Sequence, residues 1–213
     1  MPHHSESFWT SLFALFVLHL AERGAALNVW HCKEPTDGRY YEPRHSSGAI
    51  VLAGLRATDV SVEPPTGAMK SVVQGLLNEE VNAAGIRPDL FIRVPLAAPS
   101  GEWKYLFIEN KTTGGFQPNQ EENYPALLES FEKNGKPCEF LLLTSVGSCK
   151  PYESAKRFQR TMREAFGLLL WEEVLLQMKA HELKLPGIDT GAWQPFTRDF
   201  ENVVVGRKTM TAN

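Results

Sequence analysis

The stretch "LFIENKTTGGFQPNQEENYP", residues 106–125, joins an apolar run to a polar segment that contains two adjacent glycines. The apolar run ends in Glu109 and Lys111, which are separated by one residue. Side chains alternate between the two faces of a strand, so these two residues share a face if the run is extended. The stretch therefore predicts a buried strand whose last residues present a carboxylate and an ammonium on the same side.

A second strand is predicted at residues 89–94, and the turn-forming segment "AAPSG" joins it to the strand predicted at 102–109. The midpoint between Asp89 and Glu109 is Pro99, which lies within that turn. Antiparallel pairing about this turn places Asp89 nearly opposite Glu109. Two carboxylates and the ammonium of Lys111 are therefore expected at one end of the hairpin.

Two carboxylates at close range repel each other, and burial increases that repulsion. A divalent cation would resolve the conflict, and the oxygen ligands of Asp89 and Glu109 suit Mg²⁺ or Mn²⁺. The ammonium of Lys111 can then hold or deprotonate a water, or neutralise charge that builds on a phosphate. The alternative interpretation is a surface salt bridge at the end of a strand.

These residues, Pro88-Asp89 followed by Glu109-Asn110-Lys111, resemble the motif of the PD-(D/E)xK nuclease superfamily. The resemblance covers about residues 68–145. It implies an α/β fold with a restriction-endonuclease-like core, a small mixed β-sheet flanked by helices, which hydrolyses phosphodiesters with Mg²⁺ or Mn²⁺. It also implies that Asp89 and Glu109 are metal ligands, that Lys111 is the catalytic lysine, and that the backbone carbonyl of Asn110 ligates the metal.

Further along the chain, Gln120 and Tyr124 resemble the QxxxY motif of the RecB-like branch, whose side chains orient the lysine or contact DNA. The two residues are four apart and share one face of a helix predicted at about 119–133. Pro125 biases the residue before it away from helical geometry, so the helix either begins at Pro125 or kinks there. Gln117 is the alternative to Gln120.

Many members of the superfamily use a further acid from an upstream helix, which here is predicted at residues 69–84. On a helical wheel the apolar positions of this helix centre close to residue 80, which favours Glu80 over Glu79 as the third acid of the metal site. Glu22 is a further candidate. The alternative is that Glu80 lies near the helix end and extends to water.

A row of basic residues, Lys156, Arg160 and Arg163, falls on one face of a predicted helix. In a nuclease such a row can follow a phosphate backbone, which predicts nucleic-acid binding. The alternative is a solvated helix face.

The remaining segments of the chain predict a single α/β domain spanning residues 1–213. The sequence has 213 residues, of which 43% are hydrophobic, enough to bury a substantial core. The expected elements are an apolar helix at 5–27, a mostly irregular segment at 31–66 with a strand at 49–55, and a central strand at 139–144. Within the C-terminal part, residues 151–206, helices are expected at 152–166 and 168–181 and a strand near 202–205.

Composition limits the cellular setting and the partners. The net charge is −3, so contacts with nucleic acid require a local concentration of basic residues. The three cysteines form no CxxC pair, which argues against a disulfide framework and favours the cytoplasm. The apolar stretch Phe8–Leu20 is shorter than the ~20 residues that span a bilayer, so no membrane partner is expected.

The sequence therefore predicts a metal-dependent nuclease. The resemblance favours DNA over RNA as the substrate and implies roles in DNA repair, recombination or defence against foreign DNA. Many relatives act as homodimers or in larger complexes. The alternatives are an RNA endonuclease on the same fold and a non-catalytic nucleic-acid-binding or scaffold protein.

Overall fold

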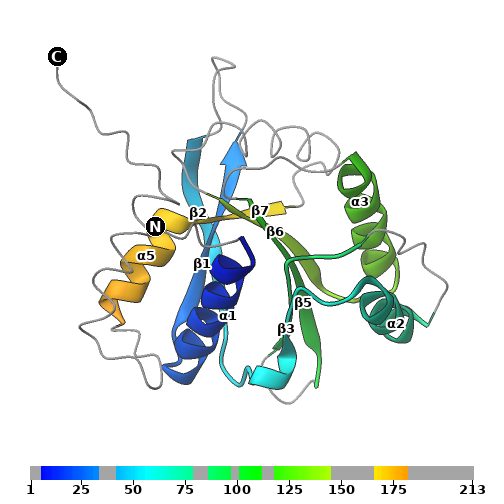
Figure 1. Ribbon diagram of the computed structural model, residues 1–213, viewed down its shortest axis with the longest axis horizontal. Helices are drawn as coiled ribbons and strands as arrows, with labels where there is room; N and C mark the ends of the chain where they lie inside the picture. Colours follow the sequence, from blue (N-terminus) through cyan, green and yellow to red (C-terminus); the bar gives the residue numbers. More distant parts are fainter. Residues whose placement is uncertain are drawn as a thin grey trace.

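The computed structural model describes residues 6–33, 42–78, 86–96, 101–111, 118–144 and 166–181. These ranges form a mixed α/β structure (Figure 1). Its elements, in chain order, are α1 (Glu6–Glu22), β1 (Ala26–Lys33), β2 (Glu42–Val51), the 3₁₀ helix η1 (Ala57–Asp59), β3 (Val60–Val62), α2 (Thr66–Leu77), β4 (Leu90–Pro95), β5 (Trp103–Lys111), α3 (Pro118–Lys133), β6 (Cys138–Thr144), β7 (Phe166–Leu170) and α5 (Trp171–Ala180).

The strands of the described ranges form one seven-stranded sheet in the order β2-β1-β7-β6-β5-β4-β3. Strand β6 pairs in parallel with β5 and with β7, and the other neighbours are antiparallel. In the β4–β5 hairpin Leu90 pairs with Ile108 and Arg93 with Tyr105, which confirms the register predicted from the sequence. The α/β class is also confirmed, although the sheet is larger than predicted.

Helices cover both faces of the sheet (Figure 1). Helices α1 and α5 pack on one face, where Leu106 and Ile108 of β5 are buried. Helices α2 and α3 pack on the other, where Tyr105 and Phe107 are buried. The apolar run of β6 contributes to both layers, as expected for a strand in the middle of a covered sheet.

The first helix is shorter than predicted because a glycine cap ends it. Gly24 has a φ of +64°, a left-handed conformation that costs glycine little. The N–H groups of Gly24 and Ala25 bond back to the carbonyls of Ala21 and Leu20, which is the Schellman arrangement. Strand β1 then begins at Ala26, inside the range predicted as helix, so the predicted end at residue 27 is wrong.

Strand β7 replaces the first part of the helix predicted at 168–181. Its sequence, FGLLL, is an apolar run whose periodicity alone does not separate a strand from a buried helix. Gly167 fits a close approach between strands, because an added Cβ would lie 2.3 Å from Cγ1 of Val29. The helix therefore begins only at Trp171.

Several predictions lie outside the described residues: the strand at 202–205, residues 152–165 of a predicted helix, and the basic row Lys156, Arg160 and Arg163. Within the described ranges, none of the helices combines the length and hydrophobicity that crossing a lipid bilayer requires.

Candidate functional site

The end of β5 and the start of β4 bring the predicted acids together. Asp89 directly precedes β4, and Glu109 lies near the end of β5. Since Leu90 pairs with Ile108, the same register places Asp89 opposite Glu109. Oδ2 of Asp89 accepts a hydrogen bond of 2.7 Å from the backbone N–H of Asn110, which fixes the aspartate against the neighbouring strand.

Glu109 is held from two sides. Its Oε2 lies 3.0 Å from Nζ of Lys111, and the two side chains are only 1% and 11% exposed. Its Oε1 accepts a hydrogen bond from the hydroxyl of Tyr124. The prediction that Glu109 and Lys111 share a face is therefore confirmed, and the pair is buried, unlike the surface salt bridge considered as the alternative.

Burial dominates the electrostatics of the two acids. It raises the pKa of Glu109, the nearby Asp89 raises it further, and Lys111 and Tyr124 oppose the shift, leaving a pKa of about 7. Burial also raises the pKa of Asp89, although the Asn110 N–H and Lys111 act in the opposite direction. Among the described residues, Oε2 of Glu109 has no donor in hydrogen-bonding geometry, despite the ion pair.

Helix α3 supplies Tyr124 from the α2–α3 face of the sheet. The helix runs from Pro118 to Lys133 through Pro125, so the alternative in which it begins at Pro125 is wrong. Tyr124 is fully buried and its ring lies 4.6 Å from that of Phe140. Its hydroxyl bonds the same carboxylate that pairs with Lys111. Gln120, one turn earlier, is half-buried.

Asn110 points its side chain to the opposite face of the sheet. Nδ2 donates to Oγ1 of Thr10 and Oδ1 accepts from Nε1 of Trp171, each at 3.1 Å. The N–H and C=O of one strand residue point toward the same neighbouring strand, so the Asn110 carbonyl is directed to the side of Asp89.

Helix α2 does not reach the glutamates predicted as the third acid. Helix α2 ends at Leu77, and Asn78 caps it in a left-handed conformation with φ 53°. The helical wheel that favoured Glu80 over Glu79 therefore extends past the end of the helix, and both glutamates lie outside the described ranges. Glu22 is exposed at the end of α1. The described residues contain no group of three His, Cys, Asp or Glu side chains placed to hold a metal.

The structure instead places Glu63 beside Asp89. Val62 pairs with Leu90, so Glu63 follows β3 opposite Asp89, and its N–H donates to the Asp89 carbonyl at 2.8 Å. Its charge contributes to raising the pKa of Asp89. Glu63 was not predicted for the site, because residues 31–66 are rich in Gly, Pro and Ser and indicate mostly irregular structure. The alternation in "VSVE" was the signal for a short strand ending at this acid.

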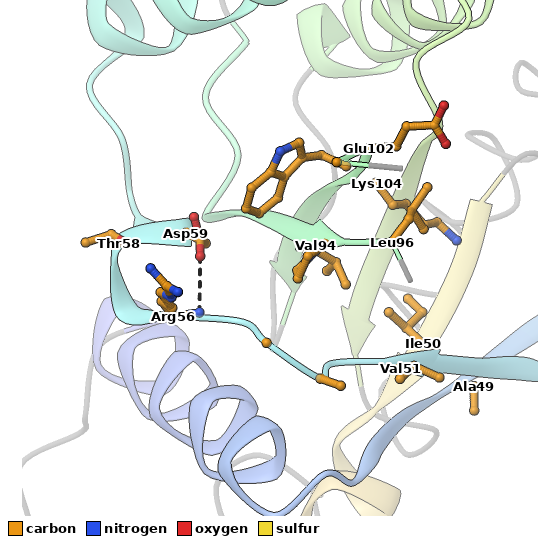
Figure 2. A pocket seen from close by; sticks show the side chains of 15 residues that line it. Ala49, Ile50, Val51, Arg56, Thr58, Asp59, Val94, Leu96, Glu102 and Lys104 are labelled. Carbon is orange, nitrogen blue, oxygen red and sulfur yellow. Dashed lines mark hydrogen bonds between the residues drawn. The ribbon is translucent and has the colours of Figure 1, made fainter. Parts of the chain in front are cut away.

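A largely apolar pocket of about 1220 Å³ lies at the other end of β5 (Figure 2). Val51, Val94 and Trp103 contribute to its lining, and Asp59 accepts a hydrogen bond from the backbone N–H of Arg56 at its rim. The length of β5, about 3.3 Å per residue, separates this pocket from Glu109. It is therefore separate from the acidic site, the group formed by Asp89, Glu109 and Lys111.

Of the residues predicted for the site, Asp89, Glu109, Lys111 and Tyr124 converge, with Asn110 fixing Asp89 through its backbone. The chain matches no family model, no curated protein and no solved structure. Its function therefore has to follow from the geometry of this site.

Proposed function

We propose that this protein is a divalent-metal-dependent nuclease that hydrolyses phosphodiester bonds at the site formed by Asp89, Glu109 and Lys111. The observation that carries the proposal is the convergence of two carboxylates and one ammonium at a buried strand end, where Glu109 has a pKa of about 7. Perturbed acids of this kind are concentrated at functional sites. A restriction-endonuclease-like core is part of the same proposal.

The donor set fits Mg²⁺ or Mn²⁺. Asp89 and Glu109 offer carboxylate oxygens, and the Asn110 carbonyl points toward the same side. Oε2 of Glu109 already has the ammonium of Lys111 3.0 Å away, but one ammonium faces two carboxylates, and a bound cation would offset the remaining negative charge. Bound there, the ion would lower the pKa of the attacking water and neutralise charge on the phosphate.

The protein groups around this acidic pair have separate tasks. Tyr124 holds Oε1 of Glu109, so the carboxylate keeps one orientation. Lys111 is buried but retains 11% exposure of its side chain, and its ammonium can orient a water or contact a phosphate oxygen. The hydroxyl of Thr144 donates to the Lys111 carbonyl at 3.0 Å, which anchors the end of β5 to β6.

The resemblance to the superfamily favours DNA as the polymer, and it suggests roles in repair, recombination or defence.

A cleavage assay tests the activity and the polymer together. Purified full-length protein is incubated with single- and double-stranded DNA and RNA, in Mg²⁺, Mn²⁺ or excess EDTA. We expect cleavage with either metal and none in EDTA. Circular substrates separate internal from terminal cleavage.

The assay has a matched control on the same strand. Lys104 is also on β5 and also pairs with a glutamate, Glu139, but it lies at the other end. Lys111→Ala should lower the cleavage rate by orders of magnitude, and Lys104→Ala should leave it intact. Undiminished cleavage in EDTA, or equal cleavage by the two variants, would overturn the proposal.

A further inference from the structure

Asn110 belongs to a buried polar network behind the acidic site. Its side chain bonds Thr10 of α1 and Trp171 of α5, and all three residues are at most 1% exposed. The surroundings are apolar, because the Trp171 ring meets Phe13 edge to face at 5.8 Å and the helices cover Leu106 and Ile108. The network therefore sits in the core layer opposite Glu109 and Tyr124.

Folding alone does not require polar groups in this layer. Buried amides and hydroxyls cost free energy unless their hydrogen bonds are made, and well-packed apolar side chains would fill the same space. A fully bonded network instead fixes one orientation of its members. Here the side-chain nitrogen of Asn110 donates to Thr10 of α1, and its side-chain oxygen accepts from Trp171 of α5. The two helices together therefore fix the orientation of the Asn110 side chain.

The backbone of Asn110 carries this constraint to the other face. Its N–H makes the 2.7 Å bond to Asp89, and it lies in the chain between Glu109 and Lys111. Rotation of the Asn110 peptide would move the Asp89 bond and both flanking side chains together. The direction of all three site residues therefore depends on how firmly this one residue is held.

We infer that Thr10, Asn110 and Trp171 form a positioning network that sets the geometry of the acidic site from the opposite face of the sheet. The inference rests on the proposed function for its catalytic meaning. It makes α1 and α5 part of the site's machinery, although neither contributes a side chain to the metal-binding edge. None of the three residues would touch the substrate.

Paired substitutions test the network. Thr10→Val removes the hydroxyl acceptor, Thr10→Ser keeps it, and Trp171→Phe removes the indole donor while retaining a ring. Asp59→Asn is the control for general destabilisation, since Asp59 is a buried acid bonded to Arg93 near the other end of the sheet.

Two measurements apply to these variants. The first is hydrogen exchange of the backbone N–H of Asn110 in metal-free protein. The reference is the backbone N–H of Ile108, a residue of the same strand that pairs with Leu90 of β4. The second is Mn²⁺ affinity by calorimetry. Outer-shell partners of metal sites are typically worth about 10- to 100-fold in affinity. We expect Thr10→Val and Trp171→Phe to weaken Mn²⁺ binding about tenfold and to speed Asn110 exchange, with Thr10→Ser close to the parent.

Equal behaviour of Thr10→Val and Thr10→Ser in both measurements would overturn the inference. So would an equal loss of Mn²⁺ affinity in Asp59→Asn, because the effect would then be general destabilisation. The exchange measurement needs neither metal nor cleavage. If the parent cleaves nothing but Thr10→Val still frees the Asn110 amide, the proposed nuclease function fails while the positioning network stands.

Discussion

Strand β5 carries a lysine–glutamate ion pair near each end, and the two pairs differ in burial and in their neighbours. Lys104 pairs with Glu139 of β6, with side chains 29% and 17% exposed. Lys111 pairs with Glu109, with side chains 11% and 1% exposed. The second pair also has Asp89 beside it and Tyr124 bonded to its carboxylate, whereas the first lies next to the open apolar pocket.

The two pairs contain the same residue types, so what distinguishes the candidate site is its burial and its neighbouring side chains. A partly exposed pair is screened by solvent and contributes little to stability. A buried pair with a second carboxylate costs desolvation and repulsion that one ammonium does not offset, as the raised pKa of Glu109 records. A cation would offset them, so the expense is explained if the site binds a metal.

The largest expected difference between the two pairs is in turnover. Lys111→Ala should lower the cleavage rate by roughly 10²- to 10⁴-fold, the range typical of a positioned proton-transfer group. Lys104→Ala should keep the rate of the parent protein. Initial rates at saturating Mg²⁺ and substrate measure both. A drop of similar size in the two variants would remove the functional distinction between the ends of β5.

Metal binding should separate the lysine from the acids within the Lys111–Glu109 pair. Asp89→Asn should weaken Mn²⁺ binding by more than about 100-fold, because it removes a charged ligand and not merely an outer-shell group. Lys111→Ala should retain binding, since an ammonium is not a ligand. Isothermal titration calorimetry distinguishes them, and collapse of binding in the lysine variant would contradict this division of roles.

The pH dependence of stability should also differ between the two glutamates. The folded-state pKa of Glu109 is about 7, raised from 4.5 by burial and Asp89, so the folded protein binds a proton more tightly than the unfolded chain. The free energy of unfolding therefore falls as the pH rises from 4.5 to about 7, and the loss is complete above that range.

Glu109→Gln should remove that loss. In metal-free protein it should gain roughly 1–3 kcal/mol relative to the parent between about pH 5 and pH 8, measured by urea unfolding. Glu139→Gln is the control, because its ion pair with Lys104 is partly exposed and screened by solvent. A parallel pH response in the two variants would mean that burial does not govern Glu109.

The smallest effect is expected at the exposed pair. A double-mutant cycle of Lys104→Ala and Glu139→Gln should give a coupling of about 0.2–1 kcal/mol, as is typical of solvent-screened pairs, and added salt should reduce it. The same cycle on Lys111 and Glu109 in metal-free protein should give a larger coupling that resists salt. Equal couplings would show that the difference in burial has no energetic consequence.

The sequence predicted the site at β4 and β5 because its information there is local. Alternation places Glu109 and Lys111 on one face, and the turn between the strands fixes which residue lies opposite Asp89. Tyr124 was reached through helical spacing and the resemblance. Each of these steps needs only a short stretch of chain.

The rest of the site depends on contacts between distant segments. Thr10 and Trp171 lie about 100 and 61 residues from Asn110, and no pattern near any of them predicts their hydrogen bonds. Glu63 was hidden because β3 has only three residues. In the fold, the FGLLL run of β7 was ambiguous between strand and helix until its packing against Val29 was known.

The most direct test of the proposed metal site is a Mn²⁺ titration of the parent, Glu109→Gln and Glu139→Gln proteins by calorimetry at about pH 8, where Glu109 is mostly ionised. The parent and Glu139→Gln should bind Mn²⁺ alike, and Glu109→Gln should bind it at least about 100-fold more weakly. If Glu109→Gln binds as tightly as the parent, or if the parent binds no Mn²⁺, the buried end of β5 is not a metal site.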